Sequence, residues 1–134
     1  MMKGATMGVL IAAMKADHES KIFQLKYLDC FGVMPEQEEI NVFRDAVMVI
    51  FSFAGSGKTM LGREKLRNKV YQYADIVDDD PVAIAAFCGA LISTVLNKKQ
   101  KVTFGYKWVA EELCERIAYY NPDASASEML NHFT

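Results

Sequence analysis

Residues 80–97 have the sequence DPVAIAAFCGALISTVLN, and this stretch decides how the rest of the chain is arranged. No charged residue lies between Asp80 and Lys98, so no face of a helix built from it would prefer water. Asp80 and Pro81 are typical of an N-cap and a first helical position. The stretch is short and rich in alanine, whereas a membrane span needs about 20 strongly apolar residues. It therefore predicts a central helix that is buried on all sides.

The composition is that of one globular domain covering residues 1–134. Hydrophobic residues make up 51% of the chain and the net charge is -2, which favours a single buried core and argues against general binding to nucleic acid. The three cysteines are odd in number and fall within apolar helical patterns, where a free thiol behaves as a small core residue. They are Cys30, Cys88 and Cys114. We therefore expect a cytoplasmic protein without a membrane partner.

The first sixteen residues, MMKGATMGVLIAAMKA, have two interpretations. A lysine followed by an apolar run is similar to a weak secretory signal, but a convincing cleavage site is missing. The apolar residues recur at steps of three and four, which favours a helix over residues 4–16 that belongs to the domain. These residues are Met7, Leu10, Ile11 and Met14.

A helical hairpin is predicted at the start of the chain. Asp17-His18-Glu19 interrupts the first helix, Ser20 is suited to cap a second, and Gly32 is suited to end it. We expect the apolar residues of the second helix to face inward. They are Ile22, Leu25, Leu28 and Cys30.

The rest of the chain is predicted to be helical as well. The further helices cover about residues 35–53, 60–77, 80–97 and 102–120, with a short last helix to residue 133. Ser125 and Glu128 have the spacing of a capping box for that last helix. Because no stretch alternates with a period of two, we predict no sheet. The expected fold is an all-α compact bundle of six to seven helices around the buried central helix.

A faint internal repeat relates the two ends of the chain. Residues 8–11 (GVLI) match residues 89–92 (GALI), and at the same offset residues 26–28 (KYL) fall beside residues 107–109 (KWV). Both blocks are predicted as helix, polar turn and helix. The repeat therefore suggests a pseudo-two-fold pair of helical hairpins.

The order of helices, with AMKAD at residues 13–17 ending an alanine-rich helix, resembles the tellurite-resistance TerB family over roughly residues 4–123. The resemblance implies two helical hairpins and a divalent-cation site built on acidic Asp-Gly turns. The departures are His18 in place of glycine, Lys21 and Ile22 in place of acidic residues, and Asn97-Lys98 in place of the second Asp-Gly. We expect the metal site to be degenerate, with Asp17 and Glu19 as its remaining candidate ligands, and we expect no cofactor.

Residues 52–59, SFAGSGKT, contain the GSGKT core of a phosphate-binding P-loop. A working P-loop also needs a buried strand before its glycines. Here the preceding segment is predicted as a helix, so we favour an inter-helix turn in which Ser56 or Thr59 caps the next helix. A nucleotide-binding switch is an alternative, with the phosphate-site candidates Gly55, Gly57, Lys58 and Thr59.

The large apolar side chains are the most informative feature for function. Eight Met, eight Phe, six Tyr and one Trp are many for a core of this size, and Tyr and Met are favoured at protein interfaces. The candidate partner-binding residues are Tyr71, Asp75, Asp78, Asp79, Tyr119, Tyr120 and Phe133. The basic residues of the fourth predicted helix are expected on its solvated face, and they are Arg63, Lys65, Arg67 and Lys69.

We therefore predict a non-enzymatic protein-binding module of bacterial or phage type, an adaptor or a stress- or defence-related interaction protein. No cysteine is spaced to pair with a histidine for nucleophilic catalysis. A homodimer would also use exposed aromatic residues. The second prediction is an immunity or inhibitor protein, since a small protein with an acidic patch would suit a basic toxin or nuclease.

Overall fold

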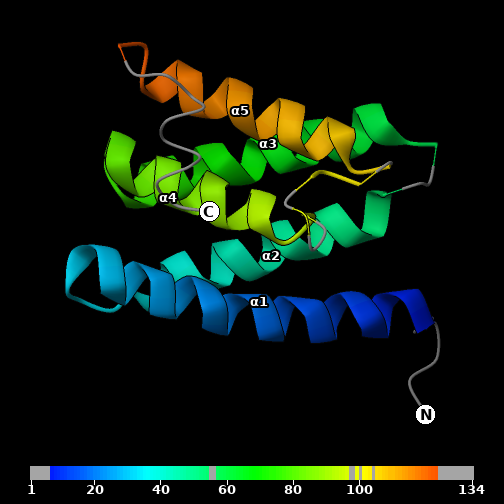
Figure 1. The fold of residues 1–134 in the computed structure, drawn as a ribbon, viewed down its shortest axis with the longest axis horizontal. Coiled ribbons are helices and arrows are strands. Elements are labelled where there is room, and N and C mark those ends of the chain that lie inside the picture. Colours follow the sequence, from blue (N-terminus) through cyan, green and yellow to red (C-terminus); the bar gives the residue numbers. More distant parts are fainter. Residues whose placement is uncertain (1–6, 55–56, 97–98, 100, 104, 124–134) are drawn as a thin grey trace.

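In the part of the chain that the structure describes, five helices make up an all-α bundle (Figure 1). The computed structural model describes residues 7–54, 57–96, 99, 101–103 and 105–123. The helices are α1 (Met7–Phe31), α2 (Gln37–Phe53), α3 (Thr59–Ile76), α4 (Pro81–Ser93) and α5 (Lys107–Tyr120). Within these residues there is no strand, and one isolated bridge joins Leu96 to Val102. None of the five helices has both the length and the apolar character that crossing a membrane requires.

The all-helical class is confirmed, but the prediction of six to seven helices is wrong because the first two are one helix. α1 continues through Asp17-His18-Glu19, none of which is a strong helix breaker. The Ser20 hydroxyl donates backward to the Asp17 carbonyl at 2.9 Å instead of capping a new helix. Without a turn in this block, the suggested pair of hairpins is wrong as well. The short helix predicted to end at Phe133 lies outside the described residues.

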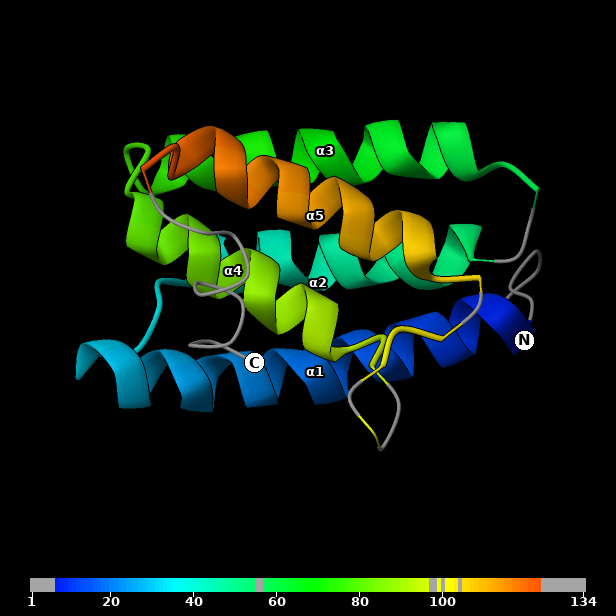
Figure 2. The same cartoon turned by 45° about the horizontal axis from the view of Figure 1, so that its top comes forward.

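α4 runs through the middle of the bundle, between α1 and the pair formed by α3 and α5 (Figures 1 and 2). Every residue from Ala83 to Ile92 is buried, as the absence of charge predicts. Asp80 caps the helix by accepting hydrogen bonds from the backbone N–H groups of Val82 and Ala83, at 3.0 and 3.3 Å. The helix ends at Ser93, four residues earlier than predicted.

Phe87 of α4 connects α4 to three other helices. Its ring stacks on the ring of Tyr73 in α3, with centroids 4.0 Å apart. It meets Phe43 of α2 and Phe23 of α1 edge to face, at 5.8 and 6.2 Å. Phe23 and Phe43 also stack on each other at 4.4 Å. One buried ring on the central helix therefore sets the positions of the helices around it.

α5 begins at Lys107, five residues later than predicted. Val102 pairs with Leu96 across the loop. The Tyr106 N–H donates to the Thr103 carbonyl at 3.1 Å, and Gly105 has a φ of 95°. This left-handed conformation is incompatible with a continuous right-handed helix and is easily adopted by glycine.

Gly62 lets α3 lie close to α2 and α5. A Cβ atom at this position would lie 2.6 Å from the Phe53 Cβ and 3.1 Å from the Trp108 Cη2. Rotation of the Phe53 side chain does not move its Cβ, so one of the helices would have to shift. We expect Gly62→Ala to lower the free energy of unfolding by about 1–3 kcal/mol, measured by urea denaturation. The exposed Lys65→Ala on the same helix is the control, and equal stability of the two variants would contradict this packing.

Candidate functional site

The outer side of α1 exposes five large apolar side chains, which we call the α1 stripe. They are Leu10, Ile11, Met14, Leu25 and Leu28. Met14 and Leu25 are the most exposed, at 70% and 66%. A helix turns by about 100° per residue, so these two side chains lie on the side opposite the buried Ala12, Ala16 and Phe23.

The position of α1 leaves this stripe open among the described elements. In both views α1 forms one edge of the bundle, and its neighbours α2 and α4 lie on a single side of it (Figures 1 and 2). A surface hollow of about 270 Å³ lies along the N-terminal half of the stripe, lined by Ile11, Met14, Lys15 and His18. The exposed apolar side chains form two groups along the helix, residues 10–14 and 25–28, separated by the exposed Asp17, His18 and Lys21. Exposed apolar groups of this kind are typical of a protein interaction site.

The prediction that Leu25, Leu28 and Cys30 face inward is wrong, because all three are exposed. The inward side of α1 instead carries small residues and one large ring, and its buried residues are Ala12, Ala16, Ser20 and Phe23. The small side chains allow close packing, while Phe23 reaches the aromatic core. The sequence of α1 has apolar residues on two sides of the helix. A core needs only one apolar side, so this pattern could have indicated that the other side is exposed.

A polar cluster lies between α3 and α5. It is centred on Glu112, whose side chain is fully buried. Arg63 Nε and Arg67 Nε donate to Glu112 Oε1 and Oε2, both at 3.0 Å, and Arg67 Nη2 donates to Oε1 at 2.6 Å. Arg116 Nε lies 2.9 Å from Oε2 as an ion pair. Arg63 also bonds Glu115 at 2.8 Å. Sequence reasoning missed this arginine–Glu112 cluster.

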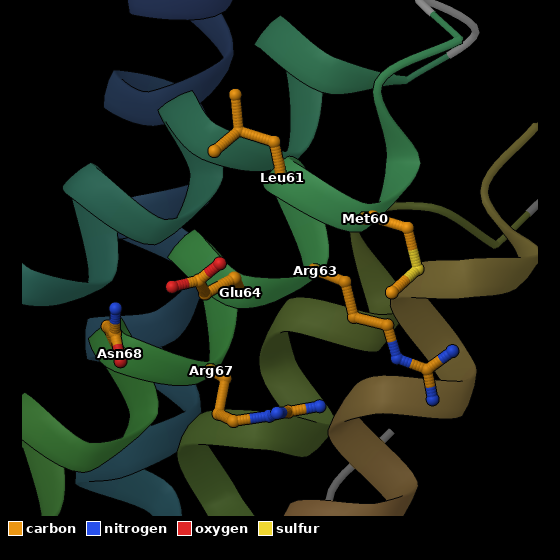
Figure 3. Close-up of a pocket in the computed structure, with 6 residues that line it drawn as sticks. All are labelled: Met60, Leu61, Arg63, Glu64, Arg67 and Asn68. Carbon is orange, nitrogen blue, oxygen red and sulfur yellow. The ribbon is translucent and has the colours of Figure 1, made fainter.

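The arginines of this cluster are committed to carboxylates. Figure 3 shows the side chains of Arg63 and Arg67 extending from α3 toward α5, while Leu61 and Glu64 point away. A surface hollow of about 510 Å³ lies here. It is lined by six residues: Met60, Leu61, Arg63, Glu64, Arg67 and Asn68. The expectation that Arg63 and Arg67 lie on a purely solvated face is therefore wrong. Because their guanidinium groups already bind Glu112, the hollow offers little free positive charge for a phosphate.

Glu39 is a second buried carboxylate, on α2. It accepts a hydrogen bond from the Tyr73 hydroxyl at 2.8 Å and from the Glu36 backbone N–H at 2.7 Å. Burial, followed by the hydrogen bond and charge of Glu39, raises the pKa of Tyr73 well above its usual value. Burial and then the Glu39 charge raise the pKa of Tyr27 to about 12. Both tyrosines are therefore held neutral beside the carboxylate in the folded protein.

Tyr73→Phe is expected to lower the free energy of unfolding by about 2 kcal/mol at neutral pH, since Glu39 loses a buried donor. The raised pKa values mean that the neutral tyrosines stabilise the fold fully below the unfolded pKa of about 10 and that this contribution is lost at higher pH. The difference between wild type and Tyr73→Phe should therefore shrink as the pH rises above about 10. Denaturation at neutral pH and at a pH above about 10 measures this difference in the free energy of unfolding. The exposed Tyr119→Phe is the control. A constant difference would contradict a neutral Tyr73 hydroxyl that donates to the Glu39 carboxylate.

Several predicted partner-binding residues meet at one end of the bundle, which we call the tyrosine–aspartate end. It consists of Tyr71, Asp75, Asp78, Asp79, Tyr119 and Tyr120. The Arg116 guanidinium lies 5.7 and 5.6 Å from the ring centroids of Tyr71 and Tyr119, and its Nη1 donates to the Tyr71 hydroxyl at 2.6 Å. Burial, followed by the charge of Asp79, raises the pKa of Tyr120. Phe133 lies outside the described residues.

The three consecutive aspartates that connect α3 to α4, Asp78, Asp79 and Asp80, have two different roles. Asp80 is the N-cap of α4. Asp78 and Asp79 are in the left-handed region, with φ of 51° and 58°, and the Asp79 N–H donates to the Ala74 carbonyl at 2.8 Å. They therefore form the tight turn that ends α3, and their carboxylates stay exposed at the surface.

The P-loop-like residues lie in a turn between two helices. α2 precedes the turn as a helix to Phe53, so the strand that a P-loop requires is not there. Gly57 is exposed with a φ of 78°. Lys58 is the N-cap residue of α3 and Thr59 is its first residue, so a capping role for Thr59 is wrong. Gly55 and Ser56 lie outside the described residues.

The two candidate ligands of the degenerate metal site, Asp17 and Glu19, both lie on α1. Asp17 forms an ion pair with Arg44 of α2, and Glu19 is half-buried on α1. Among the residues with defined positions, no group of three or more His, Cys, Asp or Glu side chains is arranged to hold a metal ion.

The chain was compared with protein-family models, curated proteins and solved structures. No protein-family model, curated protein or solved structure matches the chain. The resemblance to the TerB family therefore stays a prediction from the sequence.

Proposed function

We propose that this protein is a non-enzymatic protein-binding module, an adaptor in kind, and that the α1 stripe is its binding surface. The observation that carries the proposal is the exposure of Met14 and Leu25, which lie on the side of α1 opposite its buried residues. Burying a side chain of this size is worth roughly 1.5–3 kcal/mol. Five such side chains on one helix face are a substantial driving force for association.

The arrangement of charge supports binding rather than catalysis. The arginines of the arginine–Glu112 cluster are paired with carboxylates, and Glu39 is bonded to Tyr73. These groups hold helices together, α3 to α5 and α2 to α3. The exposed apolar side chains of α1 have no such internal role.

Affinity capture with matched variants tests the proposal. The wild-type chain, the stripe variant Met14→Glu/Leu25→Glu and the control Met60→Glu are each used to capture proteins from extracts of the native host. Met60 is a suitable control because it is 79% exposed on α3, and exposed substitutions change stability by about 0.5 kcal/mol or less. We expect proteins that bind wild type and control to be lost with the stripe variant. Identical capture by all three would refute the assignment of the surface.

The tyrosine–aspartate end favours a second candidate function, an immunity or inhibitor protein. Its exposed carboxylates and the exposed ring of Tyr119 suit a basic, partly apolar partner such as a toxin or nuclease. This candidate predicts binding of a basic nuclease that weakens with salt and is abolished by Asp75→Lys/Asp79→Lys, as measured by calorimetry. Binding unaffected by these substitutions would exclude this surface.

We also propose a cytoplasmic location. The support is chemical: Cys30, Cys88 and Cys114 are all free thiols, and Cys30 is exposed, which suits a reducing compartment. Fractionation of the native host tests it, and recovery of the chain outside the cytoplasmic fraction would contradict it.

A further inference from the structure

We infer that the α1 stripe binds a second copy of this chain, with the two α1 helices antiparallel and a two-fold axis that passes between them at the level of residue 19. This inference rests on the proposed function, because it names the partner of the same surface. A two-fold interface must be complementary to itself. The stripe meets this condition in its register and in its charge.

Four of the five stripe side chains are arranged symmetrically about its middle, and Ile11 is the exception. Leu10 and Leu28 are nine residues on either side of Glu19, and Met14 and Leu25 have their midpoint between residues 19 and 20. In an antiparallel pair with its axis there, Leu10 of one copy lies opposite Leu28 of the other, and Met14 lies opposite Leu25. With a rise of about 1.5 Å per residue, both pairs fall within one residue of the same level.

The angular positions agree with this register. At about 100° per residue, Met14 and Leu25 differ by roughly 20° and point outward along the middle of the stripe. Leu10 and Leu28 fall at the same angle on one flank. A two-fold axis perpendicular to the helices places the same flank of both chains on the same side of the interface. Leu10 of one chain therefore meets Leu28 of the other on that flank.

The charges between the apolar pairs are complementary in the same register. Asp17 and Lys21 lie on the Leu10 flank, and their midpoint is Glu19. Asp17 of one chain would therefore face Lys21 of the other, twice by symmetry. Arg44 of the same chain holds the Asp17 side chain in place while 59% of that side chain stays exposed. In a parallel pair the two-fold axis would run along the helices and place the Asp17–Lys21 flanks of the two chains on opposite sides, so these charges would not face each other.

The oligomeric state is the first test. Light scattering during size-exclusion chromatography should give a mass of about twice 15.1 kDa at high protein concentration for wild type and for Met60→Glu. Leu25→Glu and Lys21→Glu should shift to the monomer mass, with unchanged circular dichroism. A monomeric wild type at every concentration overturns the inference, while stripe-dependent capture of another protein would leave the proposed function in place. A dimer that survives Leu25→Glu overturns the inference as well.

Disulfide trapping tests the antiparallel register. In a Cys30→Ser background, the double variant Met14→Cys/Leu25→Cys should form a covalent dimer on mild oxidation, since a disulfide requires Cα atoms about 4.4–6.8 Å apart. The two single variants should cross-link to each other when mixed and far less to themselves. Self-cross-linking of each single variant would show a parallel pair and overturn the inference. The pair Met60→Cys and Leu25→Cys is the control and should not cross-link.

Discussion

Replacing Glu112 with alanine is expected to lower the free energy of unfolding by about 3 kcal/mol. The fully buried carboxylate binds Arg63, Arg67 and Arg116, so its removal leaves three guanidinium groups without their shared partner. Such losses reach about 5 kcal/mol when the remaining charges are fully buried. The value here is at the lower end, because these arginines keep 14–37% exposure and Arg63 keeps Glu115. Urea denaturation at neutral pH measures the change.

Glu115→Ala is the matched control for Glu112→Ala. Glu115 lies on the same helix and also binds Arg63, but 53% of its side chain is exposed. A surface pair of this kind contributes about 1 kcal/mol or less. Equal effects of the two substitutions would contradict the central place of Glu112 between α3 and α5.

The Glu112 effect should also depend on pH. Burial raises the pKa of Glu112, but the hydrogen bonds and charges of Arg67, Arg63 and Arg116 outweigh it and lower that pKa overall. A lowered pKa means that the stabilisation is present above the unfolded value, about 4.3, and is lost as the pH falls through the folded one. The difference between wild type and Glu112→Gln should therefore shrink below pH about 4.

Phe87→Ala is expected to lower the free energy of unfolding by about 3–5 kcal/mol. The ring is fully buried and touches Tyr73, Phe43 and Phe23 on three different helices. Removing it leaves a cavity that rigid neighbouring rings cannot fill by small movements. Guanidinium denaturation, followed by circular dichroism, measures the loss.

Phe51→Ala provides the comparison for Phe87→Ala. Phe51 is a half-buried aromatic residue of α2 that packs against Tyr106 at 5.7 Å. We expect the smaller loss here, because fewer buried atoms are removed. A smaller effect for Phe87 than for Phe51 would contradict the central position of α4.

The central helix could be predicted from sequence because its signal is local. Seventeen uncharged residues between Asp80 and Lys98 leave no polar face, and Asp80 with Pro81 marks the start. A helix was also predicted over residues 35–53, and α2 covers Gln37–Phe53, with Glu36 as its N-cap and Glu39 completing a capping box. In each case, residues within a few positions of each other carry the information.

α1 could not be predicted correctly because distant contacts decide it. Asp17-His18-Glu19 is polar enough for a turn but contains no residue that breaks a helix. The side that faces inward depends on Phe23, which stacks on Phe43 twenty residues later in the chain. Local periodicity alone therefore assigned Leu25 and Leu28 to the core.

The arginine–Glu112 cluster shows the same limit for a polar site. Arg63 and Arg67 are four residues apart, as are Glu112 and Arg116, and both spacings place side chains on one helix face. Glu112 also lies between Val109 and Leu113 on the inward side of α5, which was a usable sequence signal. The pairing of α3 with α5 supplies the rest of the site, and no sequence pattern specifies it.

Methionine oxidation tests most directly the central claim that the outer side of α1 is the contact surface between two copies of this chain. Met14 and Met60 are similarly exposed in the single chain, at 70% and 79%, so dilute protein should oxidise at both sites at comparable rates with peroxide. At high protein concentration we predict that Met14 becomes protected while Met60 continues to react, as measured by peptide mass spectrometry. Comparable oxidation of Met14 and Met60 at every concentration would contradict the claim.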